Sequence, residues 1–240
     1  MSIFLNEQLD LRPGWRFGLY IAVFAAMLYA TGGLISIFVS GEINSQLAFL
    51  AINAIALLIP GVLALMFMIR FVDQIPLLAF GIGFHQRGLR DLIVGIVVAA
   101  GMLGVLAGSI ALVGDLSITG GNIESIESTE WWLGMSVLLL ILIVSAANEE
   151  LIFRGYPLQV LMVAVGPGPA IVMMSMLFGL GHHLNPNATW LGTANTCLAG
   201  ILLCLAYART RSLWFPYGIH IGWNSLGRRY TNGCSTFVSC

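Results

Sequence analysis

Long apolar segments dominate this 240-residue chain and restrict its fold more than any other feature of the sequence. Hydrophobic residues make up 58% of the chain and charged residues only 9%, whereas a soluble domain usually carries about 25% charged residues. A stretch of about 20 apolar residues is long enough to cross a lipid bilayer as a helix. We therefore predict an integral membrane protein, all-α and polytopic, with membrane lipids around its helices.

Charges and turn residues divide the apolar sequence into about seven predicted spans that together form a single membrane domain over residues 1–240. Pro60 falls inside the second span, where a membrane helix tolerates proline as a kink. The predicted spans cover residues 17–39, 46–69, 92–114, 132–163, 168–185, 190–208 and 212–227.

The arginines indicate which side of the membrane each loop faces. They precede the first span and lie between the second and third spans and between the sixth and seventh. The charged residues of the intervening loops are all acidic. By the positive-inside rule the N-terminus is cytoplasmic, and only Arg228 and Arg229 break the pattern. The net charge of −1 gives no indication of a nucleic-acid partner.

The clearest functional signal is the pair Glu149-Glu150 at the end of a strongly apolar run. An ionised carboxylate in hydrocarbon is costly, so it should be either paired or functional. Glu150 and Arg154 have a favourable i,i+4 spacing, which predicts a structural ion pair. Glu149 points about 100° away from Glu150 around a helix. We predict that Glu149 is the free, desolvated carboxylate and a candidate general base.

Two later spans each carry isolated polar residues. Glu149 and His182 lie at nearly equal distances along the chain from the turn at Gly166, so a helical hairpin would place them at similar depth. His220 and Asn224 share one face of the last span because they are four residues apart. The sequence therefore predicts that these four polar side chains converge in one site.

Three motifs occur in order in successive apolar spans: Glu149-Glu150-xxx-Arg154, Phe178-xxx-His182 and His220-xxx-Asn224. Together they resemble the motifs of the CPBP intramembrane proteases, which include the type II CaaX prenyl endopeptidases (Rce1-like) and the Abi proteins. The resemblance covers residues 92–227, which we take as the expected catalytic core.

This resemblance implies a glutamate-dependent membrane endopeptidase that acts on a peptide or lipidated protein. Glu149 and His182 would activate the attacking water, while His220 and Asn224 would stabilise the oxyanion. General bases and preorganised donors are what amide hydrolysis requires. The supporting residues would be Glu150, Arg154 and Phe178.

Whether the reaction uses a metal ion is open, because the members of the family are often described as metalloproteases. Glu149, His182 and His220 could supply three zinc ligands and leave a fourth position open. The chain has no HExxH motif, and a water activated by glutamate alone fits the sequence too. We favour the metal-free mechanism, which requires no cofactor, and keep zinc as the alternative.

The sequence departs from the family after the third motif. Residues 228–240 are polar, contain two cysteines and show no helical pattern, which is typical of a truncated or frame-shifted end. An inactive membrane scaffold or immunity protein is therefore one alternative. A small proton-coupled transporter is another, since intramembrane Glu and His can relay protons. Nothing in the chain indicates a eukaryotic protein, so we expect a bacterial inner-membrane location.

Overall fold

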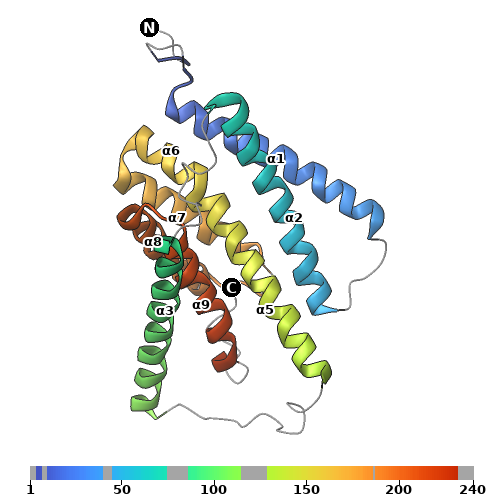
Figure 1. The fold of residues 1–240 in the computed structure, drawn as a ribbon, viewed down its shortest axis with the longest axis vertical. Coiled ribbons are helices and arrows are strands. Elements are labelled where there is room, and N and C mark those ends of the chain that lie inside the picture. The colour runs from blue at the N-terminus through green and yellow to red at the C-terminus, as the bar shows by residue number, and fades with distance from the viewer. Residues whose placement is uncertain are drawn as a thin grey trace.

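The computed structural model describes residues 4–6, 10–39, 45–74, 86–114, 129–185 and 187–231, and these residues are helical almost throughout (Figure 1). Within these ranges the extended structure consists of an isolated bridge between Leu5 and Leu11. The all-α prediction is confirmed. Most of the expected atypical tail, residues 232–240, lies outside the described residues.

Each predicted span corresponds to helical structure. The helices are α1 (Pro13–Phe38), α2 (Gln46–Phe67), which continues as the π-helical turn η1 (Met68–Val72), α3 (Gln86–Val113), α5 (Thr129–Glu150), the π-helical turn η3 (Leu151–Gly155), α6 (Tyr156–Val165), α7 (Pro167–His183), α8 (Trp190–Thr210) and α9 (Trp214–Thr231).

Five helical segments in the described part of the chain are long and apolar enough to cross a membrane, which makes this an integral membrane protein. They are Pro13–Phe38, Leu47–Val72, Arg87–Val113, Thr129–Val165 and Trp190–Thr210. α7, with 17 residues, and α9, with 18, are shorter. The expected number of seven crossings and the cytoplasmic N-terminus therefore stay predictions.

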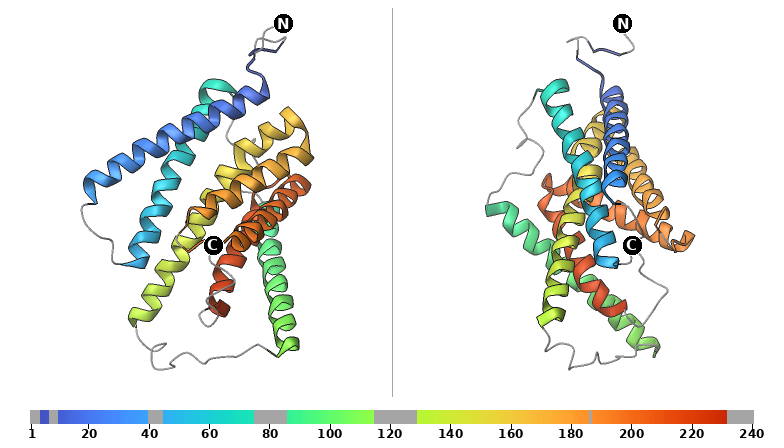
Figure 2. Two further views of the ribbon diagram at one scale, coloured as in Figure 1. Left: turned by 180° about the vertical axis from the view of Figure 1, so that it is seen from behind. Right: turned by 90° about the vertical axis from the view of Figure 1, so that its right-hand side faces the viewer.

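The helices associate in pairs around α5. The most extensive contacts join α3 to α9, α7 to α8, and α1 to α2. α5 contacts both α2 and α9 and lies between them, as Figures 1 and 2 show. α6 and α7 form the predicted hairpin, in which Gly166 adopts a positive φ of 88° that a side chain would disfavour. This arrangement brings the end of α5 close to α7 and α9.

α9 is held against α3 by direct contact between their backbones. A Cβ atom on Gly218 would overlap the carbonyl of Leu92, and one on Gly95 would overlap the carbonyl of Phe215. A Cβ atom on Gly222 would come within 2.7 Å of the Ala99 methyl group. Small residues let membrane helices pack closely without a hydrophobic driving force between them. The position of α9 in the bundle is therefore set largely by α3.

A polar contact fixes the other end of the bundle. Arg16 of α1 donates to Asp73, directly after η1, with 2.6 Å between Nη1 and Oδ1. The ring of Tyr20 stacks on that of Tyr156, with 5.5 Å between the ring centroids. These contacts connect α1 to η1 and to the start of α6.

The glycine contacts give a stability prediction. Replacing Gly218 by alanine forces α9 away from Leu92, and overpacking of this kind usually costs about 1–3 kcal/mol. Gly101→Ala on α3 is the matched control, since nothing lies within 4 Å of a Cβ atom at that position. Unfolding in detergent, followed by circular dichroism, should show a lower stability for G218A only. Equal stabilities for the two variants would contradict the packing argument.

Candidate active site

α5 ends in three consecutive polar residues that contact three different parts of the bundle. Successive residues of a helix point about 100° apart, so each meets a different set of neighbours. The Asn148 side-chain amide donates to the carbonyl of Ala54 on α2 over 2.8 Å. Glu149 faces α7 and α9, and Glu150 faces η3 and α9. The Asn148 contact, which joins α5 to α2, was not expected from the sequence.

Two imidazole rings approach the carboxylate of Glu149. Its Oε2 atom lies 3.6 Å from Nε2 of His182 and 3.5 Å from Nε2 of His220. The same oxygen is buried and has no hydrogen-bond partner among the described residues. Separations slightly beyond a direct hydrogen bond are those that a bridging water can span. The structure thus brings together three of the four residues that the sequence predicted as catalytic.

Each histidine is held from its far side. Nδ1 of His182 lies 2.8 Å from the carbonyl oxygen of Phe178, and Nδ1 of His220 lies 2.8 Å from Oε1 of Glu150. A carbonyl and an ionised carboxylate can only accept, so both rings donate from Nδ1. Their Nε2 atoms are therefore the ones that face Glu149.

Glu150 and Arg154 form the expected pair, with 3.3 Å between Oε1 and Nη1. Arg154 is fully buried, lies 4.3 Å from the centroid of the Phe178 ring and directs Nη2 toward the carbonyl of Gly200 at 3.5 Å. The Glu150 side chain is only 3% exposed and that of Glu149 is 19% exposed, so Glu150 is the more strongly desolvated carboxylate.

The regular α-helix is interrupted immediately after the two glutamates. Leu151–Gly155 form the π-helical turn η3, and Gly155 has an irregular ψ of −119° before α6 begins. π-helical turns of this kind are frequent at functional sites. The apolar pattern over residues 132–163 predicts one regular helix and does not indicate the turn, although Gly155 followed by Pro157 is a local signal of a break.

Asn224 is less well connected than the other candidates. It lies one turn after His220 on α9, is partly buried and makes no hydrogen bond with a described residue. α9 itself is tied to α5 by Tyr217, whose hydroxyl donates to the carbonyl of Ile143 over 3.1 Å. The predicted role of Asn224 in oxyanion stabilisation stays a prediction.

The three candidate zinc ligands, Glu149, His182 and His220, lie close together. His182 and His220 approach the same oxygen of Glu149, but the described residues contain no group of three or more His, Cys, Asp and Glu side chains arranged to hold a metal. The metal-free mechanism stays a prediction, and the chemistry below is derived from the side chains alone.

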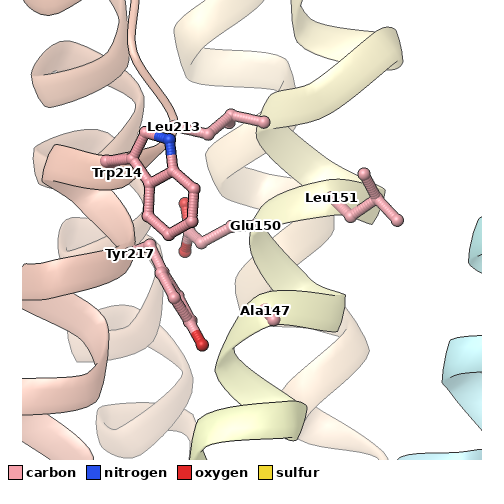
Figure 3. Close-up of a pocket in the computed structure, with 6 residues that line it drawn as sticks. All are labelled: Ala147, Glu150, Leu151, Leu213, Trp214 and Tyr217. Carbon is pink, nitrogen blue, oxygen red and sulfur yellow. The ribbon is translucent and has the colours of Figure 1, made fainter. Parts of the chain in front are cut away.

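A small apolar pocket of about 110 Å³ lies beside Glu150. Figure 3 shows the Glu150 carboxylate pointing toward the rings of Trp214 and Tyr217. Oε2 of Glu150 is buried and, among the described residues, lacks a hydrogen-bond partner. The pocket is lined by Ala147, Glu150, Leu151, Leu213, Trp214 and Tyr217.

Comparison with known proteins identifies one related family. Residues 130–226 match the family model described as type II CAAX prenyl endopeptidase Rce1-like. The match covers less than half of the chain and includes all seven predicted site residues, whereas residues 92–129 of the expected core lie outside it. The chain matches no curated protein and no solved structure.

The buried ion pair gives a second stability prediction. Arg154→Met removes the guanidinium and leaves the Glu150 carboxylate buried without that partner, and breaking a buried pair typically costs about 3–5 kcal/mol. The double variant R154M/E150Q should recover much of that loss, because no unbalanced charge remains. Denaturation of both variants in detergent measures the difference. A double variant as unstable as R154M alone would show that charge pairing is not the cause.

Proposed function

We propose that this chain is an intramembrane endopeptidase, because residues 130–226 match the family model described as type II CAAX prenyl endopeptidase Rce1-like. One observation supports the proposal best: Nε2 of His182 on α7 and Nε2 of His220 on α9 both lie close to the same carboxylate oxygen of Glu149 on α5. Hydrolysis of an amide needs a base for water and a donor for the oxyanion, and these groups can provide both.

In the proposed reaction Glu149 is the general base. It takes a proton from a water molecule placed between its Oε2 and Nε2 of His182, and the water oxygen forms a bond to the scissile carbonyl carbon. His182 donates from Nδ1 to Phe178, which leaves the lone pair of Nε2 free to accept from the same water in the neutral ring. When the C–N bond breaks, Glu149 returns the proton to the leaving amine.

His220 and Asn224 are proposed as the donors to the oxyanion of the tetrahedral intermediate. His220 already donates from Nδ1 to Glu150, so donation from Nε2 as well requires the protonated ring, whose charge Glu149 and Glu150 balance. Asn224 lies on the same face of α9, one turn away. Removing one such donor typically costs about 10²- to 10³-fold in kcat.

We propose a membrane-associated peptide or a lipidated protein as the substrate, a CaaX-type peptide being one candidate. Several apolar helices support an integral membrane location, and the bacterial inner membrane is our proposal for the compartment.

The proposal is tested with the detergent-solubilised protein and a panel of quenched fluorescent peptides that includes a farnesylated CaaX peptide. Glu149→Gln should lower kcat by about 10²- to 10⁴-fold, as expected for loss of a general base. Glu130→Gln is the matched control, because Glu130 is exposed on the first turn of the same helix. Equal activity of E149Q and wild type would refute the assignment of the base.

The role of Asn224 is tested separately in the same assay. Asn224→Ala should reduce kcat about 10²-fold with a small change in KM, since the donor acts on the transition state. A change in KM alone would move Asn224 from oxyanion stabilisation to substrate binding.

The same assay decides between the metal-free mechanism and the alternatives. Cleavage should survive a strong chelator; loss on chelation with recovery on added zinc would contradict the metal-free proposal. A folded wild type that cleaves no peptide of the panel would favour a scaffold or immunity protein. Proton-coupled flux in liposomes that is lost in E149Q would favour a transporter.

A further inference from the structure

We propose that Glu150 is a positioning residue that acts on the reaction through His220 rather than through contact with substrate. This inference rests on the proposed endopeptidase function and deepens it. It assigns to the second glutamate of the pair a task beyond its ion pair with Arg154, namely to fix the orientation of the imidazole that faces Glu149.

The geometry around His220 supports this role. Nδ1 lies 2.8 Å from Oε1 of Glu150, while Nε2 lies 3.5 Å from Oε2 of Glu149. The two glutamates therefore hold opposite edges of one ring. A partner that accepts from one nitrogen sets which nitrogen carries the proton and where the other points. Without Glu150, the ring would lose the acceptor that keeps Nε2 directed toward Glu149.

Glu150 is itself rigidly placed. The same oxygen that binds His220 also lies 3.3 Å from Nη1 of Arg154, and Arg154 is fixed over the ring of Phe178 and near the carbonyl of Gly200. The carbonyl of Phe178 in turn accepts from Nδ1 of His182. One buried network thus orients both histidines. It consists of the Glu150–Arg154 pair, the Phe178 ring and the carbonyl groups of Phe178 and Gly200.

The apolar pocket beside Glu150 makes this role directly testable. It is bordered by Glu150, opens next to Trp214 and Tyr217 and has a volume of about 110 Å³ (Figure 3). Truncation of Glu150 to alanine would add space to the pocket. A small carboxylate such as formate could then occupy the position of the missing group and accept from Nδ1 of His220.

The first measurement compares the steady-state kinetics of wild type, Glu150→Ala, Glu150→Gln and the exposed control Glu130→Ala. Loss of the partner that orients a metal-binding histidine typically costs about 10- to 100-fold in activity, and we expect an effect of similar size for His220. We expect E150A to lose this much in kcat with little change in KM, and E150Q to retain more activity because its amide oxygen still accepts. Added formate should raise the kcat of E150A, whereas chloride and bulky benzoate should not. E130A should behave as wild type.

The second measurement observes the ring directly and does not depend on activity. The chain has four histidines, so ¹⁵N-histidine spectra of the detergent-solubilised protein are simple, and the His220→Asn variant identifies the signals of His220. In wild type, Nδ1 of His220 should carry a proton. In E150A the signals of His220 should change most, and formate should shift them back.

These outcomes separate this inference from the proposed function. A wild type without peptidase activity would overturn the function, but the nitrogen spectra would still test the Glu150–His220 contact. An unprotonated Nδ1 in wild type would overturn the positioning role. So would unchanged His220 signals in E150A, or a kcat of E150A equal to that of wild type. If E150A does not fold, the wild-type spectrum and E150Q decide the question.

Discussion

The buried contact between Glu150 and Arg154 is the interaction on which the rest of this structure depends. Two ionised groups removed from water are tolerated only when each is paired and its other polar atoms are largely satisfied. Arg154 is accommodated by Glu150, the Phe178 ring and the Gly200 carbonyl, and Glu150 by Arg154 and His220. The contacts that these two charged side chains require therefore bring η3, α7, α8 and α9 together at the end of α5. The groups suited to catalysis lie at that junction.

Periodicity and spacing were sufficient to predict much of this arrangement. The apolar runs predicted the helices, because a backbone in lipid must satisfy its own hydrogen bonds. The hairpin at Gly166 placed Glu149 and His182 at equal depth, and the structure puts them 3.6 Å apart. The i,i+4 rule predicted the pairing of Glu150 with Arg154, because this contact is local in the sequence.

What the sequence did not predict depends on contacts between distant segments. The hydrogen bond that His220 donates to Glu150 joins residues 70 positions apart. No local rule predicts which carboxylate will accept from a given histidine. The greater burial of Glu150 results from this hydrogen bond and from the π-helical turn that follows Glu150. The contact of Gly95 with α9 could not be predicted either. The local sequence pattern around a glycine in an apolar helix is the same whether the glycine faces lipid or a neighbouring helix.

The run Asn148-Glu149-Glu150 also has a consequence for how this protein can change over evolution. Each of the three residues meets a different set of partners because each is rotated by about 100° from the one before it, although Glu149 and Glu150 both contact His220. Substitution of Asn148 can affect its contact with α2 and leave the contacts of the two glutamates in place. An insertion or deletion of a single residue earlier in α5 would rotate all three at once and disconnect α2, α7 and α9 together. The length of α5 should therefore be much less tolerant of change than its lipid-facing composition.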